Sequence, residues 1–160
     1  MIIAISGSVG TGKTTLAKRL AKSLNYTYLD VNKLIKVNKI FEGYDRKRKC
    51  SIVDTKKLNR VLINLIKHNK NMIIDSHLSH YLPKRYIDLC IITKCNLKTL
   101  EKRLKKRDYS KNKIRENLEA EIFDVCYEET KEQGHKIKVV DTSNRYNLKG
   151  IIKSLNLKIK

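Results

Sequence analysis

The sequence is poor in the residues that interrupt a domain. Of its 160 residues only one is proline, Pro83, and six are glycine, and no repeat or low-complexity tract is present. Without a stretch rich in proline and glycine, no interdomain linker is indicated. A chain of this length suffices for one ordinary domain with a buried core. We therefore expect residues 1–160 to form a single domain.

Long apolar runs are also missing. No segment approaches the roughly 18 consecutive apolar residues that a membrane helix requires, so we expect no membrane partner. Met1 is followed directly by the apolar residues 2–6, without the basic segment that opens a signal peptide. We therefore expect a cytoplasmic protein.

Paired cysteines are absent. The four cysteines stand singly along the chain, so neither a zinc site nor a redox dithiol is indicated. Cys90 lies within an apolar run and is expected to be a small core residue. We interpret all of them as reduced, structural thiols: Cys50, Cys90, Cys95 and Cys126.

Acidic residues are scarce relative to basic ones. The chain has 16 Asp and Glu against 36 Lys and Arg, which gives a formal net charge of +20. Such an excess attracts polyanions such as RNA, ribosomes or nucleotides. Two interpretations stay open, an RNA-rich partner or a lysine-rich bias of the source proteome. The basic residues are spread too evenly to indicate one binding face.

Five short apolar runs have the length and composition of strands in a parallel sheet. The first is rich in β-branched residues and stops at a glycine, and the third ends in a carboxylate. The expected strands are residues 2–6, 26–29, 72–75, 87–92 and 137–140.

Amphipathic helices are expected between these strands, and the first two carry clear apolar stripes. The second covers residues 54–68, and Asp54 can cap its start. The stripes are Leu16, Ala17, Leu20, Ala21 and Leu24 in the first helix, and Leu58, Val61, Leu62, Leu65 and Ile66 in the second.

Two further helices can begin at the capping residues Asn96 and Ser110, and a last one at about residue 146. Their expected stripes are Leu97, Leu100 and Leu104 after Asn96, and Ile114, Leu118, Ile122 and Val125 after Ser110. Strands that alternate with helices imply a parallel sheet covered on both faces.

Residues 7–14, GSVGTGKT, match the phosphate-binding pattern G-x-x-x-x-G-K-[ST] at every fixed position. Glycines let the backbone wrap a phosphate and turn its amides inward at a helix N-terminus. Lys13 can reach the β- and γ-phosphates of a nucleotide, and the Thr14 hydroxyl can bind Mg²⁺. The motif follows an expected strand and opens an expected helix. We therefore predict a P-loop NTPase fold, an α/β three-layer sandwich with a five-stranded parallel sheet.

Asp75 ends a buried strand, at the sheet edge where open α/β proteins bind ligands. A carboxylate there can hold Mg²⁺ through its water shell, although a helix-capping aspartate is the alternative. His77 lies two residues further on. A lone histidine is usually structural, but the neighbouring carboxylate favours a functional role for His77. The spacing alone does not predict a role for His80.

The basic segment 103–115 is either a solvated helix face or a mobile region that closes over transferring phosphates. Arg107, at the junction before the sequence Asp-Tyr-Ser, is the best placed residue of the segment for the second role.

Together these motifs resemble the archaeal and eukaryotic nuclear-type adenylate kinases, the isoenzyme-six group also described as ribosome-assembly NTPases. The similarity runs from Gly7 to about Asn144. Beyond the loop it rests on GYD at 43–45 with CSIVD at 50–54, DSH at 75–77, RDYS at 107–110 and NLEAEIFDV at 117–125.

The resemblance implies transfer of the γ-phosphoryl of ATP to AMP with Mg²⁺, an AMP-binding segment at about 30–53 and a lid at about 106–116. It also implies ATPase activity and binding to a small-subunit ribosomal protein of the uS11 type and to pre-ribosomal RNA. The residues that it assigns to ATP are Gly10, Thr11, Gly12, Lys13, Thr14, Thr15, Arg107 and Arg145. Asp108 departs from the family, which normally has Gly at this position.

Three functions follow as hypotheses. The leading one is a Mg²⁺-dependent adenylate kinase in which Lys13, Asp75, His77 and Arg107 are catalytic, with Thr14 and, through water, Asp75 at the metal. The second is a ribosome-assembly ATPase whose kinase activity is incidental. The third is a kinase for another small acceptor, such as a different nucleoside monophosphate or shikimate. The segments GYD at 43–45 and CSIVD at 50–54 argue against shikimate.

Overall fold

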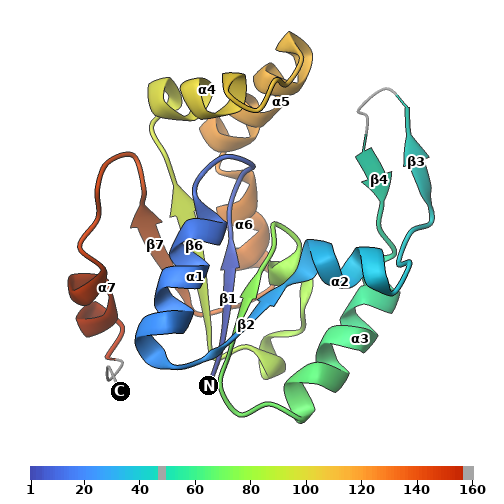
Figure 1. The fold of residues 1–160 in the computed structure, drawn as a ribbon, viewed down its shortest axis with the longest axis vertical. Coiled ribbons are helices and arrows are strands. Elements are labelled where there is room, and N and C mark those ends of the chain that lie inside the picture. The colour runs from blue at the N-terminus through green and yellow to red at the C-terminus, as the bar shows by residue number, and fades with distance from the viewer. Residues whose placement is uncertain (47–49, 157–160) are drawn as a thin grey trace.

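A parallel sheet forms the centre of the molecule (Figure 1). The computed structural model describes residues 1–46 and 50–156. The sheet has five strands in the order β2-β5-β1-β6-β7, and every neighbouring pair is parallel. The strands are Ile2–Ser6 (β1), Thr27–Asp30 (β2), Met72–Asp75 (β5), Leu89–Lys94 (β6) and Ile137–Asp141 (β7). All five expected strands are therefore confirmed.

Two of these strands begin later than predicted. The Tyr26 amide donates to the Ala21 carbonyl at the end of the preceding helix, so β2 starts one residue further on. The Ile87 amide donates to the Lys84 carbonyl in a 3₁₀ turn, Lys84–Tyr86. The apolar pattern predicted that these two amides would take part in the sheet. In the structure each donates to a carbonyl of a local turn instead.

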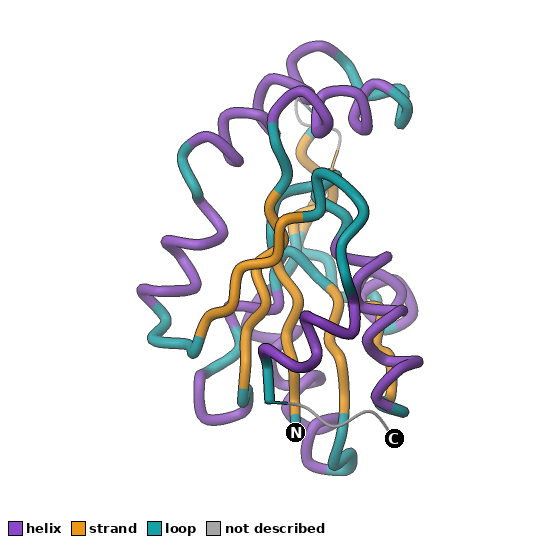
Figure 2. The backbone as a smooth tube through the Cα atoms, turned by 90° about the vertical axis from the view of Figure 1, so that its left-hand side faces the viewer, coloured by secondary structure: helices purple, strands orange, loops and turns teal. Residues whose placement is uncertain are grey.

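Helices cover both faces of the sheet, which gives the predicted three layers (Figure 2). One face packs against α1 (Lys13–Leu24) and α7 (Leu148–Ser154). The other packs against α2 (Val31–Val37), α3 (Thr55–Lys67) and, beside β6, α6 (Val125–Glu132). The P-loop NTPase fold class predicted from the sequence is confirmed.

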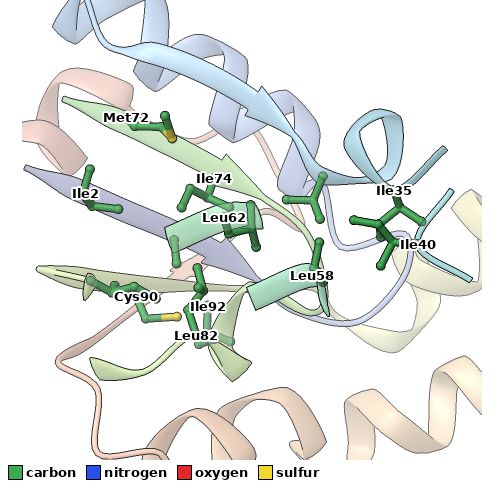
Figure 3. Close-up of a cluster of buried hydrophobic side chains, with 13 residues drawn as sticks. Ile2, Ile35, Ile40, Leu58, Leu62, Met72, Ile74, Leu82, Cys90 and Ile92 are labelled. Carbon is green, nitrogen blue, oxygen red and sulfur yellow. The ribbon is translucent and has the colours of Figure 1, made fainter. Parts of the chain in front are cut away.

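Successive residues of the central strand face opposite layers, as the period of two requires. Ile3 and Ile5 pack with α1, whereas Ile2 and Ala4 join the cluster on the other face. Figure 3 shows this second cluster, in which Leu58 and Leu62 of α3 meet side chains from three strands. The predicted core role of Cys90 is confirmed, because its side chain is fully buried there.

The predicted helix caps are present. The side chains of Asp54, Asn96 and Ser110 each accept a hydrogen bond from the backbone amide three residues further on. They begin α3, α4 (Leu97–Lys105) and α5 (Lys111–Ile122). The last helix begins at Leu148, two residues later than expected, because Asn147 caps it.

Two predicted stripes are partly wrong. Leu97 is 42% exposed at the first turn of α4, so only Leu100 and Leu104 are buried there. The stripe after Ser110 breaks because α5 ends at Ile122 and Asp124 takes a left-handed conformation with φ 54°. Ile122 is consequently 56% exposed and does not continue the buried face.

A feature that the sequence did not predict is a small antiparallel hairpin, β3 (Gly43–Asp45) and β4 (Cys50–Ile52). It projects from the body beside α2 and α3 (Figure 1). Its strands are too short for a period to be recognised. Residues 47–49 lie outside the described part of the chain, and so does the side chain of Cys50. The prediction that Cys50 is a reduced, structural thiol therefore stays a prediction.

Within residues 1–46 and 50–156 no helix is both long and apolar enough to cross a bilayer.

Candidate active site

The loop between β1 and α1 has a backbone that requires glycine. Gly7, Gly10 and Gly12 have φ values of +137°, +93° and +88°. A Cβ at Gly7 would lie 2.5 Å from the Thr93 carbonyl oxygen, and one at Gly10 would lie 2.9 Å from Leu100 Cδ1. Side chains at these positions would therefore clash as well as strain the loop.

Buried threonines hold the shape of this loop. Thr11 Oγ1 donates to the Ser8 carbonyl at 2.7 Å and lies 2.7 Å from Thr93 Oγ1. Thr142, which follows β7, donates to the Thr11 carbonyl. The Thr11 side chain is fully buried, so any contact of Thr11 with ATP would be made by its backbone. Its predicted role stays a prediction.

A cleft of about 290 Å³ opens at the carboxyl edge of the sheet. It gathers residues from the loop and the start of α1, from α2, from the end of β5 and the residues after it, and from the turn between α4 and α5. The lining residues are Val9, Gly10, Gly12, Lys13, Thr14, Thr15, Asn32, Asp75, Ser76, His77, Arg107 and Tyr109. The structure thus brings together all four residues that we predicted to be catalytic.

Lys13 is held over the loop from which it projects. Its Nζ donates to the carbonyl oxygens of Gly7 and Ser8, each at 2.8 Å. Burial lowers the pKa of Lys13 to about 8, and the Cys126 thiol and the Asp75 carboxylate partly oppose this shift. An anionic phosphate in the cleft would stabilise the ammonium form.

Asp75 is a buried carboxylate that faces the cleft from the end of β5. Its Oδ2 accepts a hydrogen bond of 2.9 Å from the Tyr28 hydroxyl. The 3₁₀ turn that follows, Ser79–Tyr81, has no side-chain cap, so the helix-capping alternative for Asp75 is not supported. Sequence reasoning missed Tyr28, because its approach to Asp75 depends on the pairing of β2 with β5.

His77 lines the cleft and is partly exposed to solvent there. The surrounding protein, the Lys13 ammonium and His80 hold the pKa of His77 below its usual range. The ring is therefore neutral at pH 7, and it can accept a proton or a hydrogen bond from a water molecule.

A second cleft of about 630 Å³ adjoins the first and shares Gly10, Gly12, Thr15 and Arg107 with it. Arg145, which the resemblance assigned to ATP, lies here. So does Arg103, which we did not single out: its Nη2 donates to the Thr142 carbonyl at 2.6 Å and its Nη1 to Thr142 Oγ1 at 3.2 Å. The other lining residues are Arg19, Lys106, Thr142, Ser143, Asn144 and Tyr146.

Comparisons with known proteins bear directly on this arrangement. The AAA domain family matches residues 3–124, more than half of the chain. A protein of Methanocaldococcus jannaschii, provisionally named an adenylate kinase, is 37% identical over 145 residues, which cover 91% of this chain and 78% of the relative. A Caenorhabditis elegans protein named adenylate kinase isoenzyme 6 homolog is 33% identical over 131 residues, covering 81% and 72%.

The chain belongs to the adenylate kinase isoenzyme 6 family. The resemblance that the sequence motifs indicated is thereby confirmed. Among solved structures, deoxyadenosine kinase from M. mycoides with bound dATP superposes with a TM-score of 0.62 at 20% identity, covering 98% of this chain and 100% of that one. This last similarity shows a shared fold.

The segment of about 106–116, which the resemblance predicts to be a lid, includes the turn between α4 and α5. Lys106 ends α4, Arg107 follows at the rim of both clefts, and Ser110 caps α5. Asp108 between them has φ 55°, a left-handed conformation that glycine adopts without cost. The geometry explains why a glycine suits this position in the family. None of the ion pairs of the described residues joins Asp108 to Arg107.

The oxygen donors at the cleft suit a magnesium ion. The Thr14 hydroxyl and the Asp75 carboxylate both line it. In the described part of the chain no group of three or more His, Cys, Asp or Glu residues could form a metal cage. Mg²⁺ commonly uses one or two protein oxygens together with substrate phosphates and water. The donor set therefore fits an ion that arrives with a nucleotide.

Proposed function

We propose that this chain is a Mg²⁺-dependent adenylate kinase that converts ATP and AMP into two ADP. The main support is that one cleft joins Lys13 and Thr14 of the loop to Asp75, Arg107 and Asn32. Asn32 comes from α2, within the segment 30–53 that the family resemblance assigns to the acceptor. Its relatives carry the name adenylate kinase.

The phosphates of ATP would lie along residues 10–15, where the amides of the loop and the N-terminus of α1 can bind anions. The adjoining cleft, with Arg145 and Tyr146, would take the nucleoside. The two clefts meet at Gly10, Gly12 and Thr15, so one extended ligand can occupy both.

Thr14, and Asp75 through water, would hold Mg²⁺ with ATP. The ion would neutralise charge on the β- and γ-phosphates when bound. Tyr28 restrains the Asp75 carboxylate by its hydrogen bond, so the carboxylate is already oriented.

The AMP phosphate needs no dedicated base, because it is anionic at neutral pH. An AMP oxygen attacks the γ-phosphorus, the bond from that phosphorus to the β–γ bridging oxygen breaks, and ADP leaves from the donor side. Lys13 and Arg107 supply positive charge toward the transferring group, and the protein mainly positions the two nucleotides.

A second candidate is a ribosome-assembly ATPase with incidental kinase activity. The net charge of +20 favours an RNA-rich partner, and the neutral His77 ring lies where it could orient an attacking water. Binding to a uS11-type ribosomal protein or to pre-ribosomal RNA, with ATP hydrolysis faster than transfer to AMP, would favour this function.

The choice of acceptor is tested by a comparison of AMP, dAMP, CMP and UMP at equal concentrations, with diphosphate formation as the readout. We expect AMP to be used best. Equal turnover of all four would make the adenylate kinase assignment wrong, and a preference for a pyrimidine acceptor would indicate a different nucleoside monophosphate kinase.

A further inference from the structure

A second polar cluster lies buried behind the cleft and takes no part in the proposed chemistry. His80 is at its centre, 1% exposed. Its Nδ1 lies 2.8 Å from the Oγ of Ser6, and its Nε2 lies 3.0 Å from a carboxylate oxygen of Glu129. Glu129 also accepts a hydrogen bond of 3.0 Å from the Tyr81 hydroxyl.

The chemistry of the partners fixes the direction of these hydrogen bonds. A carboxylate only accepts, so His80 Nε2 carries a proton and donates it to Glu129. Burial lowers the pKa of His80 and favours the neutral ring. Nδ1 is then an acceptor, and the Ser6 hydroxyl donates to it. Ser6 is thereby held in one rotamer by a histidine whose own orientation Glu129 sets.

A serine, a histidine and a carboxylate in a row suggest a nucleophile, but burial excludes that role. Ser6 is fully buried and His80 nearly so, and neither lines a described cleft. No substrate could reach the Ser6 hydroxyl. The cluster must therefore act on the position of its neighbours.

Ser6 is the last residue of β1 and immediately precedes the phosphate loop. Its carbonyl accepts a hydrogen bond of 3.2 Å from Thr93 Oγ1, the same hydroxyl that contacts Thr11 of the loop. The side chain and the carbonyl of Ser6 are thus fastened on different sides, one to His80 and one to β6. The start of the loop has little freedom to shift.

His80 also belongs to the segment that follows Asp75 and His77. Within this segment Ser79 Oγ lies 3.2 Å from the Ile5 carbonyl of β1 and donates to the Ser76 carbonyl at 2.8 Å. The His80 carbonyl accepts a hydrogen bond of 2.8 Å from the buried ring of His135. The Ser6 hydroxyl also lies 3.4 Å from the His77 carbonyl. Of the two contacts that Ser6 Oγ makes with this segment, the one with His80 is the shorter. It joins the two halves of the site, the loop with Lys13 and the turn with Asp75 and His77.

We propose that His80 is a positioning residue that keeps the phosphate loop in register with the Asp75–His77 turn. This role rests on the proposed phosphoryl transfer at the cleft. The loop is also held locally by Thr11 and Thr93, so ATP binds when the link to His80 is lost. Transfer, however, requires the γ-phosphate to be aligned with groups from both halves, and a small misplacement slows it strongly.

Two substitutions of His80 separate its two hydrogen bonds. His80→Asn places an amide oxygen near the position of Nδ1, where it can accept from Ser6. His80→Gln places an amide near the position of Nε2, where it can donate to Glu129. It removes the acceptor at Nδ1 and leaves Ser6 only the longer contact of 3.4 Å with the His77 carbonyl. Ser6→Ala removes the same link from the other side. Tyr81→Phe is the matched control, because it removes a hydrogen bond to Glu129 and leaves Ser6 untouched.

The readouts are kcat for γ-phosphoryl transfer, the Kd of a non-hydrolysable ATP analogue and the Tm. We expect His80→Gln and Ser6→Ala to lower kcat roughly tenfold or more, with the Kd changed less than about threefold. His80→Asn and Tyr81→Phe should stay within about threefold of the wild-type kcat. All rates are measured well below the lowest Tm of the set.

Three results would overturn the positioning role: unchanged kcat in His80→Gln and Ser6→Ala, an equal loss in His80→Asn, or a fall in kcat and affinity together. Failure of the proposed function can be told apart from failure of the positioning role, because the wild-type protein would then form no ADP from AMP. In that case the same split between kcat and Kd is read from phosphate released by ATP hydrolysis.

Discussion

At the scale of single residues, Lys13 has the surroundings expected of a lysine that binds phosphate. Its ammonium is held by two carbonyl oxygens of the loop that would wrap the phosphates, and its pKa of about 8 lies well below that of a free lysine. Because burial causes this shift, the ammonium has lost hydration that an anion can replace. The residue is poised to gain from contact with a phosphate.

This pKa predicts a pH dependence for ATP binding. Below pH 8 the free protein carries a charged Lys13, and above pH 8 it loses that charge, so affinity for ATP should fall as the pH rises from 7 to 9.5. Bound phosphates raise the pKa of Lys13, and kcat at saturating ATP should fall less than kcat/KM. The Kd of an ATP analogue, measured over this range, reports the effect.

Lys13→Arg is the control, because a guanidinium stays charged throughout the range. Its Kd, although weaker, should show no inflection near pH 8. The same inflection in both proteins would mean that a group other than Lys13 titrates.

At the scale of elements, local signals were predictable and tertiary ones were not. Asp54, Asn96 and Ser110 cap their helices through amides three residues away. Both partners of each hydrogen bond are neighbours in the sequence, so the caps could be predicted from it. The end of α5 was missed because Asp124, in a left-handed conformation, interrupts an apolar pattern that continues in the sequence. Arg103 was missed because its partner Thr142 lies 39 residues away.

The turn between α4 and α5 yields a prediction at the same scale. Asp108 has a left-handed backbone that costs a residue with a Cβ about 1 kcal/mol or more, and aspartate tolerates it better than alanine. Asp108→Ala should therefore lower the free energy of unfolding by about 1 kcal/mol, whereas Asp108→Gly should change it by less than about 0.5 kcal/mol. Urea unfolding of the two variants measures the difference. Equal stability of both would show that the turn does not require this conformation.

At the scale of the whole molecule, the fold followed from the alternation of strands and helices, and the cleft from the carboxyl edge of a parallel sheet. That one cleft contains Lys13, Asp75, His77 and Arg107 could be predicted, because each of them belongs to a recognisable motif. The contacts of Tyr28, Arg103 and His80 could not be predicted, because they join segments that are distant in the sequence. The charge of +20 is a property of the whole surface and indicates no single face.

The central claim is that the cleft transfers a phosphoryl group between two nucleotides. It is tested most directly with ATP labelled at the γ-phosphate, incubated with AMP and Mg²⁺, with the label followed into ADP or inorganic phosphate. Lys13→Ala is the variant that we expect to lose activity, and Lys22→Ala, at an exposed lysine of the same helix, is its control. We expect the label to enter ADP with the wild-type and Lys22→Ala proteins, and Lys13→Ala to be at least about 100-fold slower. Label that appears only in inorganic phosphate, or near-normal transfer by Lys13→Ala, would contradict the proposed phosphotransfer.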